Sequence, residues 1–155
     1  MNRSTLAVTL STLASIAALA GCGTSHAGDN PPVGPRACKP RATAAETYML
    51  AWNTAERDVR RCLLSAVWSE RGRYVDPSAD VTGVDALVDH IGGYLRQFPG
   101  TRLEPTSPVV THHDVVHFTW RVVAGTKTML EGKDFGRIDG DGKFLLIAGF
   151  FPTAP

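Results

Sequence analysis

Three side chains in the sequence have types suited to proton transfer. Asp76 comes directly before Pro77 at the end of a short extended segment, and Asp134 lies within a long one, where aspartate is disfavoured. Tyr48 lies on the apolar face of a segment with helical spacing. A carboxylate can remove a proton beside a carbonyl group, and the enolate oxygen that forms needs hydrogen-bond donors nearby. A phenol is such a donor, and so is a carboxylic acid whose pKa an apolar site has raised.

Each of these side chains also has a structural interpretation. Asp76 would cap the turn that follows its strand, and Tyr48 would fill the core. Asp134 would pair with Arg121 or Lys133 across or along the strand. The residues alone leave both interpretations open.

Aromatic side chains and one histidine form a second group of candidates. His90 and Tyr94 are one helical turn apart, so they can face the same cavity. For His90, a structural role is the alternative. The expected lining of an apolar pocket is Trp68, Tyr74, His90, Tyr94 and Trp120, with Leu130, Phe118 and Phe150 as further walls.

The sequence carries no recognisable pattern of metal ligands. It has no CxxC and no Cys/His spacing typical of zinc. The segment 139–142 resembles the start of a calcium loop but lacks the later glutamate, so it is predicted to be a hairpin turn. His112 and His113 are expected in solvent at a turn before Asp114. We expect no metal, and proton transfer among carboxyl and phenol groups needs no cofactor.

Three segments with helical spacing precede most of the predicted strands. Each begins with a polar residue followed three positions later by an acid, as in a capping box. The boxes are Thr43-x-x-Glu46, Asn53-x-x-Glu56 and Thr82-x-x-Asp85. A strand over 73–76 precedes the third helix, which ends at Pro99. Gly92 and Gly93 inside that helix cost about 1 kcal/mol each against alanine, and we expect them to let another element approach closely.

After the third helix the hydrophobic pattern changes to a period of two, which is typical of strands. Strands are predicted over 102–107, 115–124, 126–138 and 144–151. Helices followed by a meander of strands predict an α+β fold. Because long antiparallel strands twist and curl, helices on one face then enclose a cavity.

Five short segments follow one another in a recognisable order. They are Tyr48-x-x-x-Trp52-Asn53, Tyr74-Val75-Asp76-Pro77, Gly83-Val84-Asp85-Ala86-Leu87, Glu131-Gly132-Lys133-Asp134-Phe135 and Ile147-Ala148-Gly149-Phe150-Phe151. Their order and spacing resemble the nuclear transport factor 2-like superfamily, in its SnoaL-like and ketosteroid isomerase-like branch. The resemblance covers residues 43–151 and implies a cone-shaped, curved antiparallel sheet wrapped around three helices.

In the isomerases of that branch, the resemblance implies three roles for matching residues. Asp76 matches the aspartate base that precedes a proline at the end of the first strand. Tyr48 and Asp134 match the hydroxyl and the protonated carboxyl that hold the enolate oxygen. The segment between Asn53 and Asp76 is longer here than in the isomerases, so the resemblance is not taken to imply their steroid substrate.

Three functions follow as hypotheses. The main one is binding of a small, largely apolar ligand in the cone cavity. The alternative is a cofactor-free isomerase or cyclase with Asp76 as base and Tyr48 and Asp134 as oxyanion donors. A second alternative is an interaction module for a protein of the cell envelope. The resemblance also leaves a homodimer open, through the outer face of the sheet.

The first 21 residues are typical of an export signal. An uncharged, largely apolar run of 15 residues follows Arg3, whereas a membrane-spanning helix needs about 20. The run ends in Leu19-Ala20-Gly21-Cys22, which resembles the bacterial lipobox and implies a signal peptide over 1–21 with diacylglycerol on Cys22. We expect an exported protein anchored to the bacterial cell membrane, on its outer face or periplasmic side. An unmodified mature amino terminus would contradict this.

Residues 22–42 are rich in glycine and proline, and are predicted to be a tether from the lipidated Cys22 to a domain over 43–155. Cys38 and Cys62 remain as an even pair in an exported protein. A disulfide between them is the prediction, worth about 3 kcal/mol through the loop it closes. The alternative is two free thiols.

The charge balance excludes some classes of partner. The chain has 16 Lys+Arg against 15 Asp+Glu, a net charge of +1. Nucleic-acid binding rests on many contacts from lysine and arginine to phosphates, so we expect no nucleic-acid partner. A hydrophobic share of 43% also argues against a wholly disordered chain.

Overall fold

A seven-stranded sheet carries three helices on one face in the computed structural model, which describes residues 38–153. The helices are α1 (Ala44–Trp52), α2 (Arg57–Val67) and α3 (Val84–Gln97). The strands are β1 (Trp68–Asp76), β2 (Ala79–Thr82), β3 (Thr101–Pro105), β4 (Val110–His112), β5 (Val115–Ala124), β6 (Lys127–Ile138) and β7 (Phe144–Phe150). None of the helices described is long and apolar enough to cross a membrane. The predicted signal peptide and Cys22 lie outside the described residues.

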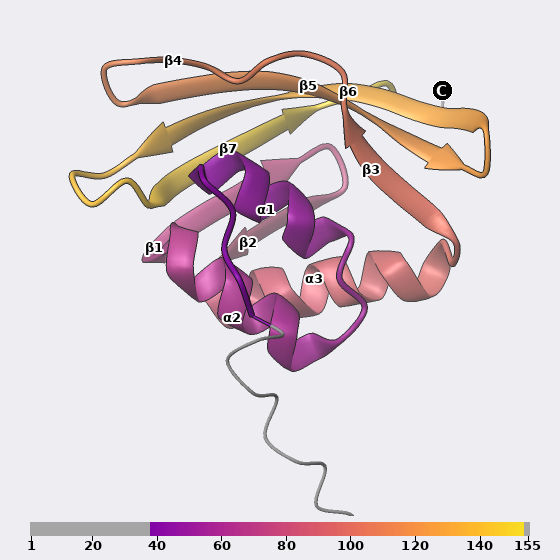
Figure 1. Ribbon diagram of the computed structural model, residues 1–155, viewed down its shortest axis with the longest axis horizontal. Helices are drawn as coiled ribbons and strands as arrows, with labels where there is room; N and C mark the ends of the chain where they lie inside the picture. Colours follow the sequence, from indigo (N-terminus) through magenta and orange to yellow (C-terminus); the bar gives the residue numbers. More distant parts are fainter. Residues whose placement is uncertain (1–37, 154–155) are drawn as a thin grey trace, which may run out of the picture. The chain divides into compact units, whose positions relative to one another are not determined.

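The strands are arranged in the order β2-β1-β7-β6-β5-β3, with β4 paired to one end of β5. Every pairing is antiparallel except that of β1 with β7, which is parallel. Figure 1 shows the long strands β5 and β6 curving over the helices. The α+β fold predicted from the sequence is confirmed, with one difference: the curved sheet is mixed rather than wholly antiparallel. Local patterns do not say which distant strand pairs with β1.

The capping box predicted at the start of α1 is present. The Thr43 side chain accepts a hydrogen bond from the backbone N–H of Glu46 at 3.2 Å, and the Glu46 carboxylate accepts one from the Thr43 N–H at 3.1 Å. The helix that follows is almost entirely buried, and it carries Tyr48 and Trp52 into the domain.

The capping boxes predicted for the other two helices are wrong. Asn53 ends α1 instead, and its side-chain amide both donates to and accepts from the backbone of Leu103, each at 2.8 Å. Helix α2 begins further along the chain, after Glu56, and no side chain caps its first turn. Thr82 is the last residue of β2, so α3 begins after Gly83, whose φ of +88° favours glycine.

Arg60 of α2 is a buried cation that joins three segments of the chain, with only 3% of its surface exposed. Its guanidinium donates to three carbonyl oxygens, those of Thr54 (2.6 Å), Ala55 (3.0 Å) and Val88 (3.0 Å). The space comes from Gly92 of α3, where a Cβ would lie 2.6 Å from an Arg60 nitrogen. Gly92 thus allows a side chain of α2 to approach α3 closely, as predicted for the glycine pair.

Cys38 and Cys62 form the predicted disulfide. Their Cα atoms are 6.0 Å apart, and 24 positions separate them in the sequence. The bond ties the segment before α1 to the middle of α2, and so fixes the start of the domain against its helices.

Candidate functional site

A cavity of about 590 Å³ lies between the helices and the inner face of the sheet. Most of its wall is apolar or aromatic, from Tyr48, Trp52, Tyr74, Tyr94, Phe98, Leu103, Trp120, Val122, Leu130 and Phe151. Its polar side chains are Asp76, Ser78, Asp89, His90, Gln97 and Asp134. Helices α1 and α3 and strands β1, β5 and β6 therefore all contribute to one site.

Seven of the eight side chains predicted to form the site line this cavity, and Trp68 does not. Trp68 is 1% exposed and lies in the core, where its ring stacks on that of Tyr48 with centroids 5.9 Å apart. Its indole N–H donates to the carbonyl of Gly72 at 3.0 Å. Gly72 leaves room for this indole, because a Cβ there would lie 2.5 Å from its nitrogen.

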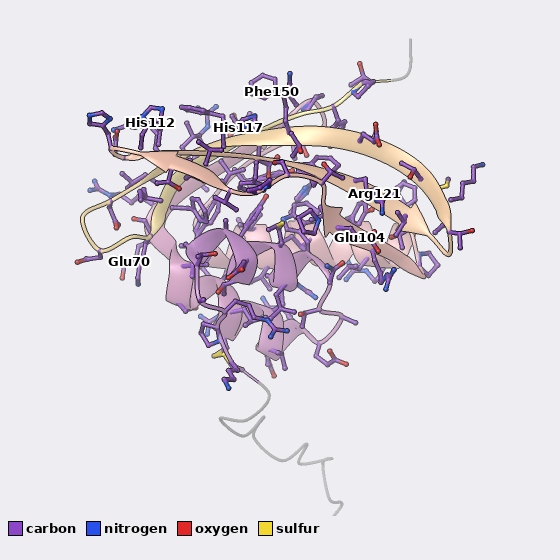
Figure 2. All side chains as sticks on the ribbon, turned by 45° about the horizontal axis from the view of Figure 1, so that its top comes forward. Glu70, Glu104, His112, His117, Arg121 and Phe150 are labelled. Atoms are coloured by element: carbon purple, nitrogen blue, oxygen red, sulfur yellow. A yellow bond between two sulfur atoms is a disulfide. The ribbon has the colours of Figure 1, made fainter. Side chains whose placement is uncertain are left out.

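The further walls expected from the sequence are only partly right. Leu130 lines the cavity, but Phe118 is fully buried in the core and Phe150 points to the opposite side of the sheet. Figure 2 shows Phe150 and His117 on the face of the sheet away from the helices. Because side chains alternate along a strand, Phe151 supplies the aromatic wall in place of Phe150.

Asp134 of β6 is a buried carboxyl group, 3% exposed. Its Oδ1 accepts a hydrogen bond from the Trp120 indole N–H at 2.8 Å. Arg121, one of the two partners that the structural interpretation allowed, binds Glu104 instead (Figure 2). Burial raises the pKa of Asp134 to about 7, against the opposing effect of the bond from Trp120, and the charge of Asp76 adds to the rise. The group is therefore poised to hold or release a proton near neutral pH.

Tyr48 of α1 is a buried phenol, 2% exposed. Burial raises its pKa well above the usual range, and the neighbouring charge of Asp134 adds to that rise. The hydroxyl therefore stays protonated and available as a hydrogen-bond donor beside Asp134.

Asp76 ends β1 with its carboxylate at the cavity. Oδ2 accepts from the Tyr74 hydroxyl at 2.7 Å, and Oδ1 accepts from the backbone N–H (2.6 Å) and the hydroxyl (2.8 Å) of Ser78. Asp76 therefore caps the turn after β1 and faces the cavity as well. The two interpretations of this residue are compatible.

Gly149 of β7 lies between the two carboxyl groups. A Cβ at this position would lie 3.3 Å from Oδ1 of Asp134 and 3.4 Å from Cβ of Asp76. It would also lie 3.7 Å from the Tyr74 hydroxyl. The parallel pairing of β7 with β1 and its antiparallel pairing with β6 thus bring the two acids together.

Trp52 is the centre of an aromatic group on the helical side of the cavity. Its ring centroid is 5.6 Å from Tyr74, 5.8 Å from His90 and 5.6 Å from Tyr94. Burial lowers the pKa of His90, with the charge of Asp76 opposing, so the imidazole is neutral at pH 7. Sequence reasoning used Trp52 as part of the segment Tyr48-x-x-x-Trp52-Asn53 and missed its place in the site, although it is one helical turn from Tyr48.

The curved sheet and its three helices have the nuclear transport factor 2-like fold. The chain belongs to the SnoaL-like domain family, whose model matches residues 45–147. No curated protein matches it.

Three solved structures illustrate the likeness. A proposed isomerase of the SnoaL-like family from Agrobacterium tumefaciens shares 28% identity at a TM-score of 0.67, over 71% of this chain and 95% of that one. An NTF2-like protein of unknown function from an Exiguobacterium species shares 18% identity at 0.58, over 72% and 100%. A proposed polyketide cyclase from Sinorhizobium meliloti shares 13% identity at 0.55, over 68% and 92%.

Proposed function

We propose that the cavity binds a small, largely apolar molecule that presents a polar group to the acidic side chains of its wall. The observation that carries this proposal is the cavity itself: about 590 Å³, with mostly apolar walls and a few convergent polar groups. Small-molecule sites have this volume and this mixture of walls. The ligand would place its apolar body against the aromatic side chains and its polar group at one of the carboxyl groups that line the cavity.

Gly93→Leu is expected to block this binding without unfolding the protein. Gly93 lines the cavity, and the nearest atom to an added Cβ is an Arg96 nitrogen at 4.0 Å. A leucine side chain can therefore enter the cavity, and it favours the helix by about 1 kcal/mol over glycine. The probe is the neutral naphthyl ketone 6-propionyl-2-(dimethylamino)naphthalene, whose emission shifts to the blue in apolar surroundings.

We expect the probe to bind the unaltered protein, and to bind Gly93→Leu at least about tenfold more weakly. Gly93→Ala is the matched control, since a single methyl group leaves most of the cavity open. Equal affinity for the unaltered protein and Gly93→Leu would place binding elsewhere and contradict the proposal.

The two carboxyl groups beside Gly149 favour a second candidate, cofactor-free isomerisation. Asp76 would take a proton from the carbon next to a ligand carbonyl, and the C–H electron pair would form the enolate. Tyr48 and protonated Asp134 would donate hydrogen bonds to the enolate oxygen. Asp76 would return the proton at the γ carbon, which moves the double bond into conjugation. The relative from Agrobacterium tumefaciens, described as a proposed isomerase, supports this candidate.

A β,γ-unsaturated ketone tests the second candidate, because its conjugated product absorbs in the ultraviolet. Asp76→Asn is expected to slow turnover at least about a hundredfold, since it removes the base. Asp141→Asn, in the exposed β6–β7 turn, is the matched control and should keep full activity. Turnover that is absent from the unaltered protein, or is unchanged in Asp76→Asn, would reject this role for Asp76.

The proposal also includes a location. The segment before Cys22 supports a lipid anchor, which would hold the cavity at the outer or periplasmic side of the cell membrane. A small apolar ligand partitions into membranes, so a membrane-bound protein would meet it at high local concentration.

A further inference from the structure

The charged side chains and aromatic rings around the cavity indicate which class of apolar ligand it binds. We infer that its ligand is an apolar organic ammonium ion, whose charged head lies against Asp76 and the aromatic side chains beside it. This inference rests on the binding function proposed above and names the chemical class of the ligand.

Every formally charged side chain that lines the cavity is acidic. Asp76, Asp89 and Asp134 line it, and within residues 38–153 no lysine or arginine does. Asp89 already has a cation, Arg57, at 3.0 Å. Asp76 and Asp134 form no ion pair with any described residue. The cavity therefore lacks the positive charge that its carboxylates attract, and an ammonium ion would supply it.

His90 does not provide that positive charge. Its ring lies 5.4 Å from Tyr74 and is half-buried, and burial lowers its pKa. The neutral imidazole contributes a ring face to the cavity and leaves the charge of Asp76 uncompensated.

The aromatic rings lie next to the same carboxylate. The Tyr74 hydroxyl donates to Asp76 at 2.7 Å, and its ring is 5.6 Å from that of Trp52. Tyr94 extends this wall along α3, 5.6 Å from Trp52 on the other side. The faces of aromatic rings attract cations, and they do so more strongly where water is excluded. A carboxylate bordered by ring faces therefore offers an organic ammonium ion two favourable contacts at once.

The head group lies near the mouth rather than at the buried end. Ser78, Asp89, Gln97 and Phe98 are the exposed lining residues, and Asp76 is hydrogen-bonded to Ser78. A head group at this depth keeps part of its hydration and avoids the full cost of burying a charge. The apolar body then extends toward Trp120. A carboxylate ligand of the same shape would be repelled at the same place, and a neutral one would gain neither contact.

Three ligands with one apolar body test the inference: 1-adamantanamine, 1-adamantanol and 1-adamantanecarboxylate. Their affinities for the purified protein are measured by calorimetry near neutral pH. We expect the amine to bind about tenfold more tightly than the alcohol, and the carboxylate to bind more weakly than both. In Asp76→Asn the amine should lose most of its preference over the alcohol, keeping only the contribution of the ring faces, while the alcohol binds as before. Asp141→Asn, which removes an exposed acid in the β6–β7 turn, should keep the full preference.

The outcomes separate this inference from the function beneath it. Equal affinities for the amine and the alcohol overturn the inference and leave a cavity for neutral ligands. A preference for the amine that is undiminished in Asp76→Asn overturns the role given to Asp76. If none of the three ligands binds and the naphthyl ketone does not bind either, the proposed function itself fails.

Discussion

Asp134→Asn is expected to stabilise the protein at pH 8 by about 4 kcal/mol. Burial raises the pKa of Asp134 in the folded state to about 7, whereas an aspartate in the unfolded chain titrates near 3.9. Between these values the folded state holds a proton that the unfolded state has lost, so stability falls as the pH rises. A difference of about three pH units corresponds to about 4 kcal/mol, which the ionised group costs above pH 7. Asparagine does not ionise, and its carbonyl oxygen can still accept the bond from Trp120.

The measurement is urea unfolding, followed by tryptophan fluorescence, from pH 4 to pH 8. The two proteins should have similar stability near pH 4, and the advantage of Asp134→Asn should grow until about pH 7. Exposed Asp141 provides the matched control, because Asp141→Asn should follow the unaltered protein throughout. A difference between Asp134→Asn and the unaltered protein that does not change with pH would show that Asp134 ionises normally in the fold.

Arg60→Met is expected to destabilise the protein by about 4 kcal/mol. Methionine keeps much of the side-chain volume but removes donors from three carbonyl oxygens, those of Thr54, Ala55 and Val88. The bond to Val88 is buried and the other two are part-buried, and a buried acceptor left without a partner costs about 1–3 kcal/mol. Two of the three lie in the turn between α1 and α2, and the third lies in α3, so the packing of all three helices depends on one guanidinium.

Arg61→Met is the matched control, one position along the same helix. Arg61 binds Asp85 at 2.6 Å, but both side chains are more than half exposed. Exposed ion pairs contribute about 0–1 kcal/mol. Urea unfolding of both variants should therefore show a large loss for Arg60→Met and almost none for Arg61→Met. Similar losses in the two variants would refute a structural role for the buried bonds of Arg60.

The predictions that succeeded depend on local patterns. The capping box of Thr43 and Glu46 acts within one helical turn. The hydrophobic period of two along β5 buries every second side chain over most of that strand. The hairpin turn at 139–142 likewise follows from its glycine and aspartate residues, and joins β6 to β7. In each case the partners are a few positions apart, so the sequence contains the whole interaction.

The predictions that failed depend on distant partners. Asn53 has the spacing of a helix cap, but Leu103, 50 positions along the chain, binds its side chain. Strand β7 is apolar on both faces, so its pattern did not show that Phe150 points outward. The bond from Trp120 to Asp134 crosses from β5 to β6 and depends on their register. Sequence reasoning therefore found the acids of the site but not the contacts that set their properties.

Strand β7 lies between β1 and β6 in the sheet but is synthesised after both, so the sheet is completed only when β7 is in place. This last strand pairs with β1 on one side and with β6 on the other, and so joins Val75 to Ala148. Until it is in place, the β1–β2 hairpin and the β3–β6 strands are two separate sheets. Contacts between positions so far apart in the sequence are slow to form. Asp76 and Asp134 thus come to share a cavity only when the final strand joins the sheet.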